Sequence, residues 1–414
     1  MISPQPEPAQ AGRGAGLRTV LLTLCVTEIT SWGVLYYAFT VLSGRIGTGT
    51  GWSAPAVTGA FSAGLVTAAL MGIPVGRWLD RHGPHGIMTA GSVLAVVALL
   101  AVAAAPTYPM FVAAWIAAGV AMSAVFYAPA FAALTRYFAP DAVRALTLLT
   151  LVAGLASTVF APLTATLASQ MSWRSTYLVL AAILAVVTIP GHLLGLRREW
   201  PAITHAHDVE TPTRIARSRA FVALTVAFAL AALASYAVIV NLVPLMTERG
   251  FSTGAAAVAL GVGGAGQVLG RLGYHRLVER FGVVTRTVVV MAAVALTTAL
   301  LGAVTSLAAL VAMAVVAGVV RGIMTLLQAT AVTERWGAAH YGHLSGILSA
   351  PVMVTTALGP FVGAVLASCL HSYATMFIVL GLAAAVAAAL AAATAPHGDA
   401  AAVDHTSANM GTRR

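Results

Sequence analysis

Twelve apolar runs, each long enough to cross a lipid bilayer, constrain the fold of this chain. They lie near residues 18–43, 54–78, 86–105, 109–137, 142–169, 173–195, 219–246, 253–278, 283–303, 306–335, 341–368 and 372–393. A membrane-spanning helix needs about 20 mostly apolar residues. Hydrophobic residues make up 59% of the chain, charged residues 8%, and the mean hydropathy is +0.91, whereas a soluble domain carries about 25% charged residues. The sequence therefore predicts an all-α integral membrane protein with twelve transmembrane helices.

The basic residues indicate how these spans are oriented. All 22 are arginine. With the N-terminus inside, Arg45, Arg174 and Arg249 face the outside, Arg271 and Arg321 lie within spans, and all the others are on the cytoplasmic side. This is the positive-inside bias, and we expect a protein of the cytoplasmic (inner) membrane with both termini in the cytoplasm. The net charge of +10 thus reflects topology, because the arginines form no stripe that would bind nucleic acid.

The chain is an internal duplication. Residues 72–88 connect the second and third spans, and this connection carries Asp80 and Arg81. An offset of 199 residues leads to Glu279 and Arg280 in the connection between the eighth and ninth spans. The same offset relates Arg136 to Arg335 and Tyr37 to Tyr236. We expect two six-helix bundles, 17–195 and 219–393, joined by a polar cytoplasmic linker, 196–218, and flanked by disordered cytoplasmic tails, 1–16 and 394–414.

The connection at 72–88 resembles the loop motif of major facilitator superfamily transporters, Gly-x-x-x-Asp-Arg-x-Gly-Arg-Arg. Gly76, Asp80, Arg81 and Gly83 match, while the residues at 84 and 85, Pro and His, replace the usual basic residues. The resemblance implies the major facilitator fold, with the substrate near the bilayer midplane between the two halves. It also implies secondary active transport by alternating access.

In that family the loop aspartate pairs with an arginine and faces a helix N-terminus, whose dipole favours a negative group. The resemblance therefore implies a latch of Asp80 and Arg136, with Glu279 and Arg335 as its mirror. The complete set of expected gating residues is Gly76, Asp80, Arg81, Gly83, Arg136, Glu279, Arg280 and Arg335. The alternative is that these are ordinary cytoplasmic charges and loop residues.

Three charges lie within spans, where each is costly unless it has a partner or a wet cavity. At 1.5 Å per residue, Glu28 lies about 15 Å deep, Arg271 about 13 Å and Arg321 about 21 Å from the cytoplasmic ends of their spans. Their repeat partners are uncharged: Ala227, Gly72 and Met122. Charges that are not duplicated are better explained by the substrate than by the scaffold. Two guanidinium groups favour a small organic anion; the alternative is a structural ion pair between Glu28 and one arginine.

Other polar groups supplement this expected site. We expect Glu28 to be the proton-coupling residue, because a carboxyl group in a poorly hydrated cavity can be protonated near neutrality. Tyr36, Tyr37, Tyr127 and Gln267 are expected to contact substrate together with the two arginines. No catalytic residue, cofactor or metal site is expected, and Cys25 and Cys369 have no paired spacing.

The sequence around Trp32-Gly33 resembles monocarboxylate porters and their oxalate and formate relatives, and so does Tyr137-Phe138 with Arg144 after it. Arg271 falls where those porters carry a substrate-binding arginine, but Gln267 replaces their aspartate. The resemblance implies a monomeric, proton-coupled carrier of a monocarboxylate-like anion in the lipid bilayer. The alternatives are an efflux pump for a toxic or secreted small molecule, such as a drug, metabolite or metalloid compound, and a transporter-like membrane sensor. We do not expect an enzyme, because the spans contain no catalytic constellation.

Overall fold

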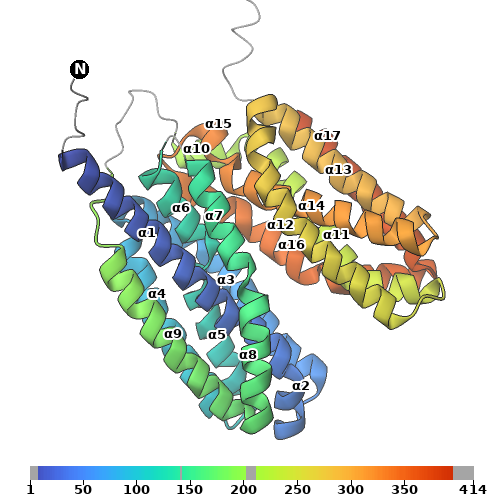
Figure 1. Ribbon diagram of the computed structural model, residues 1–414, viewed down its shortest axis with the longest axis horizontal. Coiled ribbons are helices and arrows are strands. Elements are labelled where there is room, and N and C mark those ends of the chain that lie inside the picture. The colour runs from blue at the N-terminus through green and yellow to red at the C-terminus, as the bar shows by residue number, and fades with distance from the viewer. Residues whose placement is uncertain (1–7, 140–141, 202–210, 395–414) are drawn as a thin grey trace, which may run out of the picture. The chain divides into compact units, whose positions relative to one another are not determined.

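The computed structural model describes residues 8–139, 142–201 and 211–394, and this part of the chain is helical without any strand (Figure 1). The chain divides into two compact units. The helices of the first unit are α1 (Pro8–Trp32), η1 (Gly33–Tyr37), α2 (Ala38–Thr50), α3 (Ala54–His82), α4 (Pro84–Ala104), α5 (Tyr108–Val125), α6 (Tyr127–Tyr137), α7 (Ala142–Gly154), α8 (Ala156–Gln170) and α9 (Trp173–Gly195). Those of the second are α10 (Pro212–Arg217), α11 (Arg219–Glu248), α12 (Thr253–Arg280), α13 (Val283–Ala303), α14 (Leu307–Ala331), α15 (Thr333–Trp336) and α17 (Tyr373–Ala392).

Helix α16 (Tyr341–Leu370) is shared between the units. Residues 338–357 belong to the first unit and the rest of the helix to the second. The helix bends by 50° between its parts Tyr341–Gly359 and Phe361–Leu370. The first unit therefore contains a segment from late in the sequence, which the duplication alone does not predict.

Apolar length accounts for most of the helices. Within the described residues, ten helices are long and apolar enough to cross a membrane, and the bent α16 makes an eleventh. The predicted eighth span forms the 28-residue helix α12, which is not among these eleven. This helix contains Arg271, and His275, Arg276, Glu279 and Arg280 lie near its C-terminal end.

Local sequence signals set the helix ends. The hydroxyl of Ser53 accepts a hydrogen bond from the amide of Ala56 at the start of α3, and Ser252 does the same for Ala255 at the start of α12. Such N-caps satisfy amides that have no partner within the helix. The two caps are 199 residues apart, so the duplication extends to the details of helix initiation.

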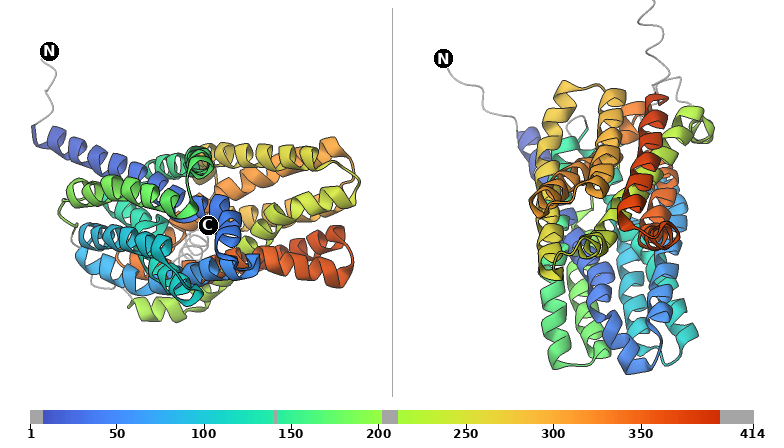
Figure 2. Two further views of the ribbon diagram at one scale, coloured as in Figure 1. Left: turned by 90° about the horizontal axis from the view of Figure 1, so that it is seen from below. Right: turned by 90° about the vertical axis from the view of Figure 1, so that its right-hand side faces the viewer.

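Helix pairing within each unit also follows the duplication. In the first unit α3 contacts α5 and α4 contacts α9, and in the second unit α12 contacts α14 and α13 contacts α17. These are corresponding pairs in the two sequence repeats. Figures 1 and 2 show α4 beside α9 and α13 beside α17.

Three spans of the first unit are irregular. The first contains the π-helical turn η1, the fourth is interrupted at Phe126 between α5 and α6, and the fifth at Leu155 between α7 and α8. The interruption at Phe126 has a local cause, because Pro129 has no amide to donate to Val125 and its ring would clash with that carbonyl. Breaks and π-turns of this kind often lie near functional sites.

Two expected boundaries differ from the structure. Helix α1 begins at Pro8, inside the stretch that we expected to be a disordered tail, and Thr394 at the other end is fully buried. The linker contains the short helix α10. Residues 1–7, 202–210 and 395–414 lie outside the described part of the chain.

Candidate functional site

The hinge between α3 and α4 carries a carboxylate that caps another helix. The two oxygens of Asp80 accept hydrogen bonds from the amides of Gly342 and His343, both at 2.8 Å. These amides lie in the first turn of α16, where no acceptor is available within the helix, and the helix dipole adds to the attraction for the charge. We call this pair of bonds the Asp80 latch; it holds the beginning of α16 on the first unit.

Arg136 at the end of α6 reaches the same residue, but through its main chain. Its guanidinium group donates to the carbonyl oxygen of Asp80 at 3.0 Å, whereas the expectation was a pairing with the side chain. The carbonyl is one of the last four of α3 and has no acceptor role within that helix. Arg136 therefore fixes the backbone of Asp80, while the carboxylate remains available to bond the amides of α16. Arg81, by contrast, is exposed to solvent.

Glycines bring α3 and α16 close together. A Cβ atom on Gly76 would collide with the carbonyl oxygen of Gly342, and one on Gly346 would lie 2.6 Å from the carbonyl oxygen of Gly72. Close backbone approach through small residues is a common form of helix packing in membranes. Gly83 has a different role, because its φ of 78° ends α3 in a conformation that other residues adopt only with strain.

The expected mirror of this latch has a different arrangement. Glu279 is exposed, and its carboxylate lies 3.2 Å from the imidazole of His275, one turn away on the same helix, which is an ion pair when the histidine is protonated. Arg280 is also exposed. Arg335 is 8% exposed and donates to the hydroxyls of Thr287, at 2.8 Å, and Thr394, at 3.3 Å. No ion pair joins Glu279 to Arg335 among the described residues. In this structure the two residues of the predicted mirror therefore have separate partners.

The ion pair at this end of the second unit joins residues that sequence reasoning missed. Arg286 in the first turn of α13 pairs with Glu334 in α15, and its side chain is only 3% exposed. The sequence held one signal: the repeat partners of these residues are Ile87 and Thr135, so both charges are unique to the second repeat.

Glu28 is the buried acid of the first unit. Its side chain is fully buried in α1. One oxygen, Oε2, accepts a hydrogen bond from the indole of Trp32 at 3.1 Å, and the other, Oε1, accepts none from the described residues. Trp32 is thus the direct partner of Glu28.

Aromatic rings surround this acid where the spans are irregular. Trp32 stacks on Phe126 at a centroid distance of 4.1 Å and lies 5.5 Å from Tyr36 and 5.1 Å from Tyr127. Tyr36 in turn contacts Tyr37 at 5.3 Å. The structure therefore brings together Glu28 and all three tyrosines that the sequence proposed. They gather around the π-turn of the first span and the break of the fourth.

Arg271 and Arg321 come together in the second unit. Arg321 lies within electrostatic range of Arg271 and of the Tyr236 hydroxyl. Arg271 is 6% exposed, and Arg321 is half-buried with an Nε that has no hydrogen-bond partner among the described residues. Tyr236 was recognised only as the repeat partner of Tyr37.

Close packing of α12 on α14 explains why these two arginines are neighbours. A Cβ on Gly270 would collide with the backbone of Val319, and one on Gly322 would collide with the carbonyl oxygen of Gln267. The glycines next to each arginine thus let the two backbones touch. The main chain of Gln267 forms part of this contact, and its side chain is half-buried.

Comparisons with known proteins identify the family. The sequence matches the Major Facilitator Superfamily over residues 23–307 and 224–409. A comparison with curated protein sequences found no significant match. Among solved structures, the chain resembles a variant of the E. coli fucose:proton symporter FucP, with TM-score 0.67, 16% identity and coverage of 91% of this chain and 98% of that one.

Two further structures give the same result. One is FucP in the outward conformation, with TM-score 0.69, 16% identity and coverage of 91% and 98%. The other is the human organic anion transporter MFSD10, with TM-score 0.68, 16% identity and coverage of 91% and 99%. These likenesses establish the fold of the whole described bundle, and the family match spans most of the sequence. The chain belongs to the major facilitator superfamily.

Proposed function

We propose that this protein is a secondary active transporter that moves a small organic anion across the cytoplasmic membrane by alternating access, with both termini in the cytoplasm. The observation that supports an anionic substrate is the pair Arg271 and Arg321. Two cations within electrostatic range of each other repel, and placing them among apolar spans is costly. A carboxylate bound between them would relieve the repulsion and accept bidentate hydrogen bonds. Tyr36, Tyr37, Tyr127 and Gln267 complete the proposed contacts.

The proposal assigns proton coupling to Glu28. A buried polar atom without a hydrogen bond is unfavourable, and Oε1 of Glu28 is such an atom. A proton that binds to this oxygen and leaves it during the transport cycle would give the carboxyl group a role that its packing does not explain. Trp32, which donates to the other oxygen, would hold the carboxyl group in one orientation in both protonation states.

The names of the structural relatives agree with this class of activity but do not define it here. FucP is named a fucose:proton symporter and MFSD10 an organic anion transporter. At 16% identity these proteins share the fold alone with this chain. The monocarboxylate-like substrate therefore rests on Arg271 and on the Trp32-Gly33 resemblance.

Uptake of labelled monocarboxylates into proteoliposomes, with and without an imposed proton gradient, tests the proposal. Arg271→Ala should weaken uptake at least about tenfold, because a hydrogen bond to a charged group contributes about 1.5–3 kcal/mol and 1.4 kcal/mol is tenfold. Arg276→Ala is the matched control, since Arg276 lies on the same helix and is exposed. If no anion is taken up, and if the Arg271→Ala variant functions as the wild type does, the proposal of an anionic substrate is refuted.

Glu28→Gln tests the coupling separately. The amide has the shape of the carboxyl group but does not exchange a proton near neutral pH. The variant should still exchange substrate across the membrane but should lose accumulation driven by the proton gradient. A Glu28→Gln protein that accumulates substrate and responds to pH as the wild type does would exclude this residue as the proton site.

A second candidate function is efflux of a small apolar compound. It is favoured by the aromatic cluster of Trp32, Tyr36, Phe126 and Tyr127, which could contact an aromatic or aliphatic body. Inside-out vesicles that accumulate such a compound, with uptake insensitive to Arg271→Ala, would favour efflux of a neutral molecule over anion transport.

A further inference from the structure

The chain that follows α9 folds back against the hinge between α3 and α4. We call residues 196–200 the strap. Its backbone turns where the amide of Arg198 donates to the carbonyl of Leu196 at 2.8 Å. The hydroxyl of Tyr137 then donates to the carbonyl of Arg198 at 3.2 Å. The strap is therefore tied to the end of α6 by its main chain, although sequence reasoning placed it in a solvated linker.

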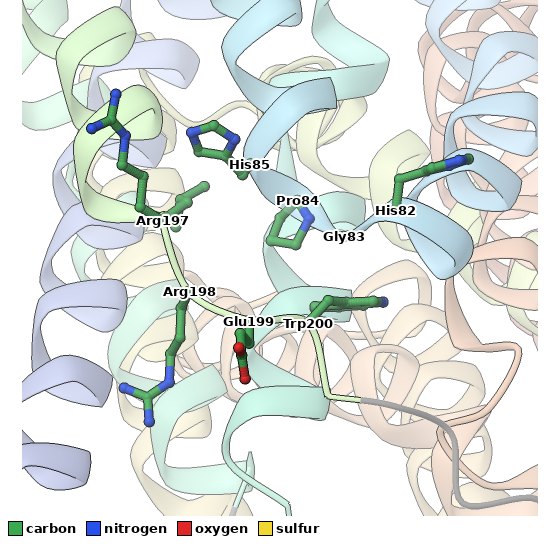
Figure 3. A pocket seen from close by; sticks show the side chains of 9 residues that line it. His82, Gly83, Pro84, His85, Arg197, Arg198, Glu199 and Trp200 are labelled. Carbon is green, nitrogen blue, oxygen red and sulfur yellow. The ribbon is translucent and has the colours of Figure 1, made fainter.

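Trp200 at the end of the strap is held on several sides. The guanidinium group of Arg136 lies over its ring at 4.4 Å, and the ring of Tyr137 meets it edge-on at 5.3 Å. Gly83 lies directly against the indole, since a Cβ atom there would be 3.1 Å from the ring. Figure 3 shows the indole beneath Gly83 and Pro84. Gly83 is thus required both for its positive φ and to admit the ring.

The contacts of Trp200 converge on Asp80. The indole nitrogen donates to the carbonyl of Asp80 at 3.1 Å, and this carbonyl also accepts the bond from Arg136. The carboxylate of the same residue forms the latch to α16. One residue therefore has its main chain fixed by two donors from α6 and the strap, while its side chain holds a third element.

We propose that Trp200 is a positioning residue of the Asp80 latch, and that the strap controls how readily the latch opens during transport. Trp200 acts through Asp80: its indole fixes the backbone of Asp80 and covers Arg136, so the carboxylate is already oriented towards the amides of Gly342 and His343. Release of the strap weakens both restraints on the Asp80 backbone at once. The proposal rests on transport by alternating access and not on the anionic substrate.

The surroundings of the strap fit a movable element. A cavity of about 380 Å³ lies between the strap and the hinge, bordered by His82, His85 and Arg197 among others, so part of the strap is not packed against the hinge. In Figure 3 the side chains of Arg197 and Arg198 point in opposite directions. Because these charges do not converge, the cavity is better explained as room for the strap than as an anion site.

Hydrogen–deuterium exchange of the full-length protein tests this directly, because the amides of Gly342 and His343 are the donors of the latch. Trp200→Ala should speed exchange of the peptide containing these amides about tenfold, equivalent to about 1.4 kcal/mol. Trp200→Phe keeps the ring but loses the donor, and should give an intermediate increase of about threefold. It also keeps the test decisive if the alanine variant folds poorly.

Two comparisons separate positioning from general destabilisation. Trp78→Ala is the matched control, since Trp78 is an exposed ring on α3 whose aromatic contact is with His82 at 4.4 Å; its exchange at Gly342 and His343 should equal that of the wild type. In an Asp80→Asn background, Trp200→Ala should add little further increase, because both changes act on one latch. Wild-type exchange in Trp200→Ala, or a full additional increase in the Asp80→Asn background, would overturn the proposal.

The exchange experiment needs no substrate, so it is independent of the proposed anion. In vesicles, Trp200→Ala should change the turnover rate of transport while leaving the substrate concentration for half-maximal binding within about twofold. A wild type that takes up no anion would contradict the proposed substrate and leave the exchange result standing. An unchanged exchange rate would contradict the role of Trp200 whatever the protein carries.

Discussion

Helices α3 and α12 hold corresponding places in the two sequence repeats, yet the same positions make different contacts. In α3, Gly76 allows the backbone of α16 to approach, and one turn later Asp80 caps the first turn of that helix. In α12 the corresponding residues are His275 and Glu279, which are exposed and bond to each other. The two positions that contact another helix in the first repeat form a surface ion pair in the second.

The difference continues one turn deeper. Gly72 of α3 lies against Gly346 of α16, whereas its repeat partner is Arg271, which lies close to Arg321. Duplication has thus preserved the helices and their pairing but not the chemistry of this face. Where the backbone of α16 comes close to α3, only glycine fits; the corresponding position of α12 carries the charged side chain of Arg271. The following experiments test this contrast, from the largest expected effect to the smallest.

The largest effect is expected from the ion pair that only the second repeat possesses. Arg286→Ile introduces the residue type found at Ile87 in the first repeat, and leaves Glu334 partly buried without its partner. Removing one member of a buried pair costs about 3–5 kcal/mol. Thermal unfolding in detergent, followed by intrinsic fluorescence, should show a marked fall in stability.

The paired variant Arg286→Ile with Glu334→Thr reproduces the first repeat at both positions. The double variant leaves no buried charge without its partner, which is the main cost of the single change, so it should recover part of the lost stability. If the double variant is as unstable as the single one, the charges have a role beyond neutralising each other.

Asp80→Asn should have the next largest effect. The amide can accept a hydrogen bond through only one of its two side-chain atoms and has no charge, so one bond to α16 is lost and the other is weakened. A hydrogen bond to a charged group contributes about 1.5–3 kcal/mol, which predicts exchange at Gly342 and His343 about ten to one hundred times faster. Exchange at the wild-type rate would mean that the carboxylate does not hold α16.

Gly76→Ala should have an effect in the same range or slightly smaller, because its methyl group would collide with the backbone of Gly342 and force α16 away from α3. Overpacking of a close contact costs about 1–3 kcal/mol. We expect a slower transport cycle and faster exchange at the start of α16. The control is His275→Ala at the matching position of α12, where stability and transport should remain those of the wild type.

Glu279→Gln should have the smallest effect. An exposed ion pair one turn apart on a helix contributes about 0.3–0.5 kcal/mol, and among the described residues Glu279 has no ion pair or hydrogen bond to another element. Transport should remain within about twofold of the wild type. A loss of transport as large as that of Asp80→Asn would restore the symmetric gate that the duplication suggests.

The contrast also limits a rule drawn from the repeat. Charges within the spans that are not duplicated were expected to belong to the substrate. Arg286 and Glu334, which lie outside that group, are not duplicated either, and they pair with each other. The rule still separates Arg271 and Arg321 from the hinge residues, but it cannot by itself distinguish a binding site from a structural pair.

Sequence periodicity and length were sufficient for the helices. Apolar runs predicted their order, and Ser53 and Ser252 mark two of their starts. The grouping of Glu28 with Tyr36 and Tyr127, by contrast, depends on how the first span packs against the break of the fourth. The hydrogen bond from Trp32 to Glu28 was within reach of sequence reasoning, because residues four apart lie on the same helix face.

The sequence by itself determined the class of protein, the number of apolar runs and the duplication, because helix formation in a bilayer depends on local composition and length. Only the tertiary structure decided which charges meet. In the structure the carboxylate of Asp80 accepts a hydrogen bond from α16, and its main-chain carbonyl accepts hydrogen bonds from Arg136 and Trp200. These partners are brought together by packing between distant segments. A repeat fixes where a residue stands on its helix, but its partner depends on which backbone comes close enough to touch it.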